Sequence, residues 1–421
     1  MILEDEEYVP KAFRKNKEQE NNIKEKHKTK HGRKVETKNN KKIKRKIFKI
    51  LIVIILIIII VLGISLAIFS NRWKKLAKEM FNNKNSVVID TDGNEIAKIG
   101  CERKNKQIAL TDIPVDLKNA YVAIEDERFY SHNGVDIKRT GGAILSYITH
   151  RGSSSYGGST ITQQLVKNLT GDTTDSIARK IKEWWKAWQL ETCFSKDEIL
   201  EMYLNIIYVG PNMYGIETAS QYYFNKSSKD LSLEECAFLA GINNSPNSYN
   251  PFGEKDNSEK IRKRTKTVLS KMLELNYINE DNYNESINNV DKGLKFKKGK
   301  IETDSAVYSY HTDELISEII KDITKKYKMS ETFATNYINM AGLTIHSTQS
   351  SKIQEITENE FEKSKYRIPS KNGGNSSQAA MVIIDHKTGY VLGCVRRIRK
   401  KDGSKTSKQS YSEYKTDRFS Y

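Results

Sequence analysis

The segment EDERFYSHNG, residues 125–134, places three carboxylates beside two aromatic rings. It follows the apolar stretch NAYVAI, whose packing brings the first acid to the edge of a hydrophobic core. A carboxylate partly screened from water by rings such as Phe129 and Tyr130 can act as a general base. The segment therefore predicts a general base among its acids. Taken alone, the same residues fit equally well a solvated helix end with an acidic turn.

The segment GGSTITQQLVKNL, residues 157–169, predicts a helix whose first turn can hold an anion. Free N–H groups at a helix N-terminus, with Lys167 and Asn168 farther along, suit an anionic oxygen such as that of a phosphate. The alternative is only a well-capped helix in which Gln163 completes a capping box with Thr160. The segment lacks the residue order of a nucleotide-binding phosphate loop.

The segment SIARKIKEWWKAWQL, residues 176–190, predicts an amphipathic helix. The apolar stripe consists of Ile177, Ile181, Trp184 and Trp188. The polar stripe consists of Arg179, Lys180, Glu183 and Lys186. We expect the tryptophans to lie in the core. The polar stripe is either a set of solvated pairs one turn apart or a carboxylate held by two cations at the floor of a cleft. In the second case the cations are available to a diphosphate.

A helical scaffold is expected to position these segments. From residue 114 to about residue 276 the apolar pattern is mostly helical, with capping-box signals at Thr160, Ser195 and Ser232. Upstream, residues 86–99 alternate around an Asp-Gly turn and predict a hairpin.

The segments after the helical stretch differ from it in composition. Residues 277–305 are rich in Asn, Lys and Asp and are interpreted as a connection. Residues 306–395 mix helix and strand patterns. With 421 residues, the chain is expected to hold two or three domains.

Residues 50–69 form a run of twenty residues without a charge, about the length that crosses a bilayer as a helix. A cleavable signal peptide is the competing interpretation, but the run is long for one and follows a leader of 49 residues. That leader holds 17 Lys and Arg against 8 Asp and Glu, which predicts a cytoplasmic N-terminus. Everything after Asn71 is then expected outside the cell.

The formal net charge of +17 raises the alternative of a nucleic-acid partner. The basic leader carries no interleaved aromatic residues and no nucleic-acid-binding motif, so we interpret it as a solvated arm beside anionic lipid and expect no nucleic acid. Four cysteines without C-x-x-C spacing argue against a metal site and predict buried thiols, although a disulfide stays open; they are Cys101, Cys193, Cys236 and Cys394.

Taken together, the segments resemble the motifs of the family 51 glycosyltransferase domain of class A penicillin-binding proteins. EDERFYSHNG resembles the first motif, GGSTITQQLVKN the second, RKIKE the third and KDEILEMYLN the fourth. The likeness spans roughly residues 112 to 275. RTKTVL resembles the fifth motif, R-R-x-x-V-L, but Thr265 replaces the second arginine. This departure puts one donor-side cationic contact in question, for which Lys263 or Lys266 is the candidate substitute.

The resemblance implies a mainly α, lysozyme-like domain that polymerises lipid II, an undecaprenyl-diphosphate-linked disaccharide peptide, into β-1,4-linked glycan strands. The transfer inverts the anomeric centre. Glu125 looks like the base that takes the proton from the attacking sugar 4-hydroxyl, while cations stabilise the departing diphosphate. Glu183 is expected to orient these cations or to hold a divalent cation, Mg²⁺ or Mn²⁺.

The resemblance assigns roles residue by residue. The catalytic residues are Glu125 and Glu183. The substrate-binding residues are Asp126, Phe129, His132, Ser159, Thr160, Gln163, Gln164, Lys167, Asn168, Arg179, Lys180 and Arg264. Among these, the cations at the leaving group are Lys167, Arg179, Lys180 and Arg264, and the residues lining the cleft near the donor are Ser159, Thr160, Gln163 and Gln164. The residues that support the fold are Gly134, Glu201, Tyr203 and Asn205.

The second half resembles a linker and the opening strand of a transpeptidase domain, AAMVIIDHKTGYVLGCV. The S-x-x-K, S-x-N and K-T-G order is absent, so we expect no transpeptidase activity. We interpret KTG at 387–389 as a strand turn and the S-x-x-K match at Ser412 and Lys415 as chance. The tail from about Arg396 is interpreted as an out-of-frame or artificially ended remnant. Residues 376–395 have then lost their sheet partners and are expected to be disordered or aggregation-prone.

The domain prediction follows from these segments. It comprises a cytoplasmic tail (1–49), a transmembrane helix (50–69), a hairpin-containing linker (70–111), the glycosyltransferase domain (112–276), a second linker (277–375), an incomplete α/β transpeptidase start (376–395) and a non-native tail (396–421).

The expected location is the bacterial cell membrane, crossed once, with the catalytic domain outside. The expected partners are lipid II, the growing glycan chain, membrane lipids and other cell-wall synthesis or division proteins. A flap formed by residues 135–156 is expected to dip into the membrane interface. Two alternatives stay open: a lytic glycosidase on a lysozyme-like scaffold, and an inactive membrane-anchored gene fragment.

Overall fold

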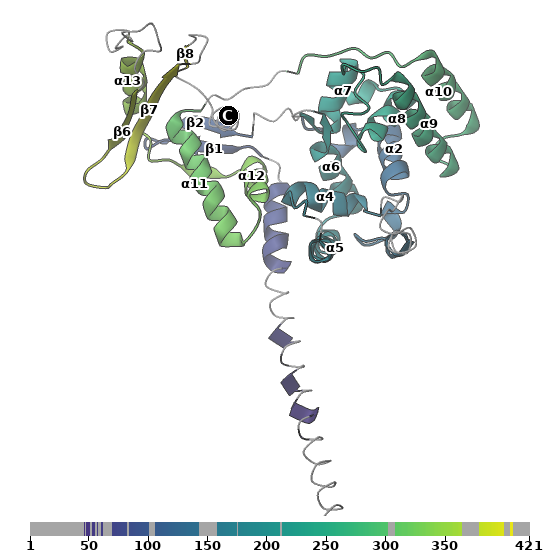
Figure 1. Ribbon diagram of the computed structural model, residues 1–421, viewed down its shortest axis with the longest axis horizontal. Helices are drawn as coiled ribbons and strands as arrows, with labels where there is room; N and C mark the ends of the chain where they lie inside the picture. Colours follow the sequence, from purple (N-terminus) through teal and green to yellow (C-terminus); the bar gives the residue numbers. More distant parts are fainter. Residues whose placement is uncertain are drawn as a thin grey trace, which may run out of the picture. The chain divides into compact units, whose positions relative to one another are not determined.

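The computed structural model describes residues 46, 48–50, 53–54, 57, 60–61, 70–81, 84–100, 106–142, 158–174, 176–210, 213–301, 308–363, 379–399 and 405–406. The chain divides into two compact units, residues 1–71 and residues 72–421. Figure 1 shows that helices predominate, as the sequence predicted, with strands at the two ends of the second unit's sequence.

In the first unit, the described residues between 46 and 61 are helical. Seven apolar side chains are half or more exposed there, namely Phe48, Ile50, Val53, Ile54, Ile57, Ile60 and Val61. Within the described residues, no helix is both long and apolar enough to cross a bilayer. Most of the predicted span at 50–69, and the predicted cytoplasmic tail up to residue 45, lie outside the described residues.

The second unit contains the helical domain that the sequence predicted around its motifs. Its helices are α2 (Val115–Glu125), α4 (Ile161–Thr170), α5 (Ile177–Glu191), α6 (Lys196–Ile206), α7 (Ile216–Phe224), α8 (Leu233–Ile242), α9 (Ser258–Glu274) and α10 (Glu280–Lys292). Three short 3₁₀ turns join them, η1 (Leu110–Asp112), η2 (Phe129–Ser131) and η3 (Ser228–Asp230), with a small β3–β4 hairpin (Tyr208–Gly210, Met213–Tyr214). α8 forms the centre, because every residue from Glu235 to Ile242 is buried.

The predicted helix starts are largely confirmed. Capping boxes with both hydrogen bonds begin α6 at Ser195 and α8 at Ser232. At α4 only half of the box forms. The Thr160 hydroxyl accepts from the Gln163 amide, but the Gln163 side chain is buried without a hydrogen-bond partner among the described residues.

The interpretation of residues 277–305 as a connection is wrong for its first part. Residues 280–292 form α10, which begins at an Asn279 cap and buries Ser286 and Val290. The helix packs against α9 and α8. Its polar composition hid it, since only one narrow face carries apolar side chains.

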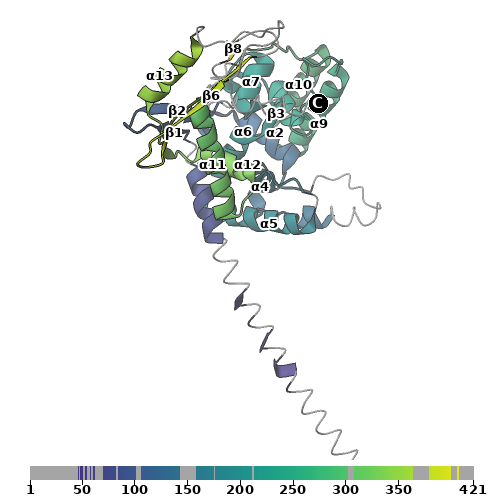
Figure 2. The ribbon, with the colours of Figure 1, turned by 60° about the vertical axis from the view of Figure 1, so that its left-hand side comes forward.

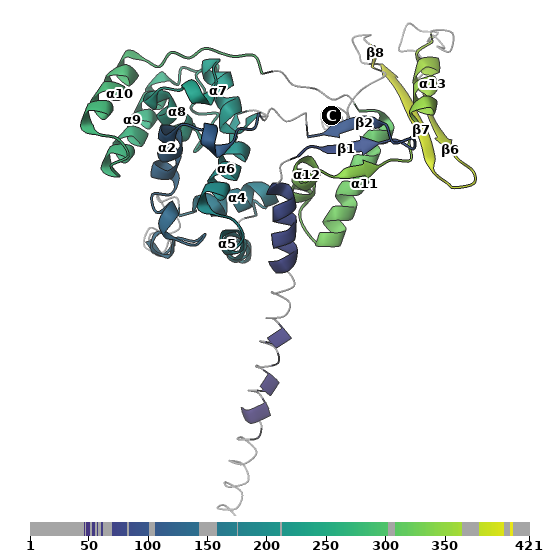
Figure 3. The ribbon, with the colours of Figure 1, turned by 180° about the vertical axis from the view of Figure 1, so that it is seen from behind.

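Segments on both sides of the helical domain join in one small sheet. β1 (Ser86–Ile89) and β2 (Glu95–Ile99) form the predicted antiparallel hairpin, and β5 (Thr344–His346) pairs with β1 in parallel. Figure 3 shows this hairpin from behind. α11 (Tyr310–Tyr327) and α12 (Glu331–Met340) precede β5, and α13 (Ser351–Glu362) follows it.

α12 contacts the helical domain directly. Its Asn336 side chain donates to the backbone oxygens of Asn168 and Leu169, 3.0 and 2.9 Å away, at the C-terminal end of α4. Ser330, which caps α12, donates to the Thr170 oxygen. Figure 2 shows α12 beside α4. The downstream segment therefore supplies hydrogen-bond donors to carbonyls that the helix end leaves unpaired.

Residues 379–399 form a hairpin of β6 (Ala379–Ile384) and β7 (Val391–Arg399), and β8 (Lys405–Thr406) pairs with β7. The KTG sequence lies in the turn before β7, where Gly389 has a φ of 74°, as predicted. The expectation of disorder is wrong for residues 379–395, because α13 packs on β7 and Gln354 exchanges two 2.9 Å hydrogen bonds with Cys394. Ser412 and Lys415 lie outside the described residues.

The cysteines that the structure describes are unpaired thiols. Cys236 is buried in α8, and burial raises the pKa of its thiol well above the ordinary value. Cys193 and Cys394 are partly exposed. Cys101 lies outside the described residues, so the question of a disulfide stays open for it.

Candidate active site

Glu125 is the last residue of α2, and its half-buried carboxylate receives two amide hydrogen bonds. The Gln164 side chain of α4 donates to Oε2 over 2.7 Å. The Asn243 side chain, at the end of α8, donates to Oε1 over 3.1 Å. Both donors are neutral, so they orient the carboxylate without neutralising its charge.

Tyr203 of α6 closes these contacts into a ring of four side chains. Its hydroxyl donates to Gln164 Oε1 over 3.0 Å and accepts from Asn243 Nδ2 over 2.9 Å. Burial, and then the nearby Glu125 charge, raise the pKa of Tyr203 well above the ordinary value, so its hydroxyl stays protonated. Tyr203 was expected to support the fold, and the structure places it directly behind the predicted base.

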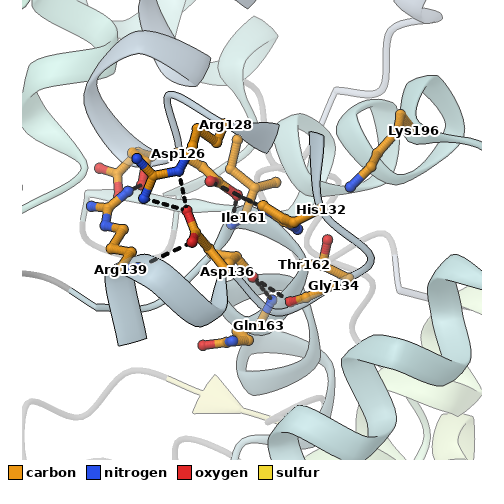
Figure 4. A network of polar contacts seen from close by, with 12 residues as sticks. Asp126, Arg128, His132, Gly134, Asp136, Arg139, Ile161, Thr162, Gln163 and Lys196 are labelled. Carbon is orange, nitrogen blue, oxygen red and sulfur yellow. Dashed lines mark hydrogen bonds and ion pairs between the residues drawn. The ribbon is translucent and has the colours of Figure 1, made fainter. Parts of the chain in front are cut away.

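Asp126, the next residue, faces inward and ties α2 to the start of α4. The carboxylate is fully buried, accepts from the Ile161 amide over 3.0 Å and contacts His132 Nε2 at 3.0 Å. Figure 4 shows these contacts. Phe129 is buried as well. As placed, Asp126 and Phe129 expose no surface to a substrate, and their predicted substrate contacts stay predictions.

Gly134 and Thr160 fasten the end of the first motif. The buried Thr160 hydroxyl donates to the Gly134 oxygen over 2.7 Å. Gly134 has a φ of +79°, and a Cβ atom there would lie 2.7 Å from the Ala187 carbonyl carbon of α5. Only glycine fits this contact without displacement, because the conformation disfavours L side chains and the space is filled.

A second network, which the sequence analysis missed, fixes the backbone at Glu125 (Figure 4). Arg139 donates from its guanidinium to the Glu125 backbone oxygen over 2.6 Å and from its amide to Asp136 Oδ1 over 3.0 Å. Arg128 pairs with Asp136 Oδ2 at 2.7 Å. Burial opposes ionisation of Asp136, but the hydrogen bonds from Arg139 and Arg128 outweigh it and lower the pKa of Asp136.

α5 carries the predicted carboxylate held by two cations. Glu183 is buried, with Arg179 Nη1 at 2.6 Å from Oε2 and Lys180 Nζ on Oε1. Lys180 also donates to the Ser159 hydroxyl over 2.8 Å. Of the two interpretations of the polar stripe, the structure therefore shows the clustered one, in contact with the segment before α4.

The expectation that the tryptophans of α5 lie in the core is wrong for Trp188. Ile177, Ile181 and Trp188 are 81, 56 and 43 % exposed. The helix is rotated so that Glu183 and Ala187 face the protein, because Ser159 and Gly134 lie against that side. Trp184 is partly buried. The pattern identified two faces correctly but not which of them is covered.

The remaining predicted cations lie in different settings. Lys167 is exposed on the α4 face that carries Gln164, and its side chain has no hydrogen bond or ion pair within the described residues. Arg264 of α9 donates through Nε to the Gly241 oxygen over 3.1 Å. Thr265 is buried and hydrogen-bonds within its own helix, so the position that departs from the fifth motif faces the core.

One of the two proposed substitutes for the missing arginine is already paired, and the role of the other stays a prediction. Lys266 pairs with Asp291 of α10 at 2.6 Å. Lys263 is exposed on α9.

Glu201 and Asn205 of α6 hold the segment that enters the domain. Asn205 exchanges hydrogen bonds of 3.0 and 2.8 Å with the Ile108 backbone, and Glu201 accepts from the Leu110 amide over 2.9 Å. A cavity of about 310 Å³ lies beside them, lined also by Met80 and Phe81. These contacts agree with the supporting role that the resemblance implies.

The described part of the chain holds no cluster of side chains that could enclose a divalent cation by itself. No group of three or more His, Cys, Asp or Glu side chains is close enough there to hold a metal ion. Glu183, the predicted ligand, already has a cation on each carboxylate oxygen. Glu183 as the holder of a divalent cation against a diphosphate stays a prediction, because oxygens of the substrate would complete such a site.

Sequence reasoning missed Asn243 and Arg139. Asn243 lies in GINNSPNSYNP, about 120 residues after the base, and no local pattern links the two. Arg139 lies in the segment interpreted as a flap. Residues 137–142 of that segment are helical, and residues 143–157 lie outside the described part.

Comparison with known proteins finds a matching family model and similar sequences. A family model described as transglycosylase matches residues 92–273. Penicillin-binding protein 1A of Clostridium botulinum strain Langeland is 41% identical over 313 residues, covering 73% of this chain and 38% of that protein. Its counterpart in Clostridium perfringens strain 13 is 38% identical over 333 residues, covering 74% and 48%. Penicillin-binding protein 1A/1B of Bacillus subtilis is 37% identical over 273 residues, covering 64% and 28%. The chain spans less than half the length of each relative.

Proposed function

Residues 92–273 are a transglycosylase domain, and from this premise we propose that the chain is a peptidoglycan glycosyltransferase for bacterial cell-wall synthesis. Its substrate is lipid II, and its product is a β-1,4-linked glycan strand. The observation that carries the proposal is the pairing of an oriented carboxylate with a cation cluster on one short segment. Ser159 accepts from Lys180, and Gln164 donates to Glu125.

The spacing of these two contacts suits a glycosyl diphosphate. Ser159 lies just before α4, and Gln164 is the fourth residue of that helix. A sugar with its diphosphate fits between a base at one end and cations at the other. Lys167, exposed on the same face of α4 as Gln164, adds positive charge along this path.

The reaction follows from these positions. Glu125 removes the proton of the acceptor 4-hydroxyl as that oxygen forms a bond to the donor's anomeric carbon. The bond from that carbon to the diphosphate breaks on the opposite face, and the diphosphate leaves with the electron pair, which inverts the centre. Lys180 and Arg179, held by Glu183, stabilise the charge that develops on the leaving oxygen.

The buried members of the predicted site are proposed to act through others. Asp126 and His132 fix the entry to α4, and Thr160 fixes Gly134. Arg264 holds the Gly241 carbonyl, two residues before Asn243. The roles of Gln163 and Asn168 near the donor stay as the resemblance implies. A divalent cation held by Glu183 against the diphosphate stays a proposal, and no step is routed through it.

The proposed location is the outer face of a bacterial membrane, with residues 50–69 as a single span and a cytoplasmic N-terminus. Trp73 follows that run by four residues and is buried, donating to the Lys186 oxygen of α5 over 3.3 Å. The exposed Ile177 and Trp188 then suit the bilayer interface, where tryptophan is enriched.

The finer architecture is also part of the proposal. The helical domain is lysozyme-like, the sheet and helices around α11 and α12 form the linker, and β6–β7 is the start of a transpeptidase domain. Besides lipid II and the glycan chain, the partners are membrane lipids and other cell-wall proteins, and no nucleic acid.

The test compares two substrates with the detergent-solubilised chain. Lipid II should be consumed and polymer should appear on a gel, whereas finished glycan should stay intact. Consumption of finished glycan instead would indicate a lytic glycosidase. A folded chain that leaves both untouched would contradict the proposal and favour an inactive fragment.

A further inference from the structure

We propose that Asn243 is a positioning residue for the catalytic base, an inference that rests on the proposed glycosyl transfer. It holds Glu125 in one rotamer and donates a hydrogen bond to one of its carboxylate oxygens. None of the motifs discussed above contains this residue. Its amide nitrogen lies 3.1 Å from Glu125 Oε1 and 2.9 Å from the Tyr203 hydroxyl.

Hydrogen bonds hold the C-terminal end of α8 in place and so fix the backbone at Asn243. Asn243 caps the helix with φ −54° and ψ −32°. One turn earlier, the Tyr121 hydroxyl of α2 donates to the Leu239 oxygen over 2.9 Å. Arg264 holds the Gly241 oxygen from α9. Hydrogen bonds from α2 and α9 therefore hold the last turn of α8, which Asn243 caps.

The directions of the hydrogen bonds determine which amide atom faces the base. Tyr203 has one hydroxyl hydrogen, which goes to Gln164 Oε1. The Tyr203 oxygen must then accept, so the NH₂ group of Asn243, not its carbonyl oxygen, points at it. The second hydrogen of the same NH₂ group reaches Glu125. The ring therefore supplies one donor to each carboxylate oxygen and is fully satisfied.

The choice of an amide has a chemical consequence. A lysine or arginine in this place would form an ion pair and withdraw basicity from the carboxylate. A neutral donor favours the ionised form through one hydrogen bond and leaves lone pairs for the acceptor hydroxyl. The titratable and charged groups facing Glu125 from the packed elements are Tyr121, Asp126, Tyr203 and, on its backbone oxygen, Arg139.

The test measures initial rates of lipid II polymerisation against pH for the full chain and its variants. Asn243→Leu removes the donor at similar volume. Asn243→Gln keeps a donor on a longer stem. Asn244→Leu is the matched control, because the neighbouring asparagine is exposed and lies outside the ring. Thermal unfolding of each variant is followed in parallel.

For Asn243→Leu we expect kcat to fall about tenfold with KM changed less than about twofold, and the acidic limb of the pH–rate profile to move up by about one unit. Asn243→Gln should recover part of kcat, and Asn244→Leu should match the parent. If Asn243→Leu does not fold, the isosteric Asn243→Asp replaces it, with Asn244→Asp as control, and should move the limb farther because two carboxylates then compete for one proton.

The possible failures are distinguishable. An active parent whose Asn243→Leu variant keeps the same kcat and pH profile overturns the role of Asn243 and leaves the proposed function intact. A loss of activity with an unmoved pH profile also overturns it, because that pattern indicates a merely structural residue. A folded parent without activity on lipid II overturns both proposals together.

Discussion

Removal of the Asp126 carboxylate tests whether this residue positions the site from inside. Asp126→Ala leaves two buried N–H groups without an acceptor, those of Ile161 and His132. Each unsatisfied buried group costs about 1–3 kcal/mol, so we expect a loss of about 4 kcal/mol in the free energy of unfolding.

The conservative variant gives a sharper expectation. In Asp126→Asn, the amide oxygen can still accept from Ile161, but an NH₂ group then faces His132 Nε2. His132 Nδ1 is buried without a partner in the described part of the chain, so the ring can carry its proton there and accept through Nε2. The expected loss is then about 1 kcal/mol, the scale of one exchanged hydrogen bond.

Urea unfolding followed by tryptophan fluorescence measures this difference. All four tryptophans, Trp73, Trp184, Trp185 and Trp188, lie at or near α5, so the signal reports on the region around the site. Equal losses for Asp126→Asn and Asp126→Ala would refute the exchange of tautomers at His132. An unchanged unfolding midpoint with a raised KM for lipid II would instead identify Asp126 as a substrate contact.

Three further predictions concern the cation cluster, the first motif and a buried lysine. Lys180→Met should lower kcat for lipid II about 100-fold with little change in KM, because the cation acts on the leaving group; a raised KM at constant kcat would contradict this. Gly134→Ala should lower the free energy of unfolding, measured in urea, by about 2–4 kcal/mol, because its Cβ would meet α5 within 3 Å. Gly293→Ala, at a glycine with a φ of +95° and open space around it, should lower it by only about 1 kcal/mol. Burial lowers the pKa of Lys186 from 10.5 to about 8. Between pH 8 and pH 10 the unfolded chain therefore binds more protons than the folded chain. The free energy of unfolding of the parent should then rise from pH 8 towards pH 10 relative to that of Lys186→Met. Parallel pH curves for the two proteins would contradict this prediction.

Local features of this chain could be predicted from the sequence because their partners are near in the chain. Glu183 meets Arg179 and Lys180 within one helical turn, and Ser195 meets Glu198 in a capping box. Spacing alone determines these contacts. The same holds for the hairpin at residues 86–99.

The ring around Glu125 could not be predicted in this way. Its members come from α2, α4, α6 and α8, and only the packing of these helices brings Gln164, Tyr203 and Asn243 to one carboxylate. The exposed apolar stripe of α5 shows what sequence periodicity cannot predict. Periodicity identifies an apolar face, but the neighbours decide whether that face is covered, and here Gly134 fits against the opposite side.

The central claim is that Glu125 removes a proton from an acceptor sugar during polymerisation of lipid II. The most direct measurement compares the initial rate of polymer formation by the parent with that of Glu125→Gln, which keeps the shape and loses the base. We expect the parent to form polymer and the folded Glu125→Gln variant to form it about 10²–10⁴-fold more slowly. A variant that polymerises lipid II at the parental rate would contradict the proposed role of Glu125 as the base.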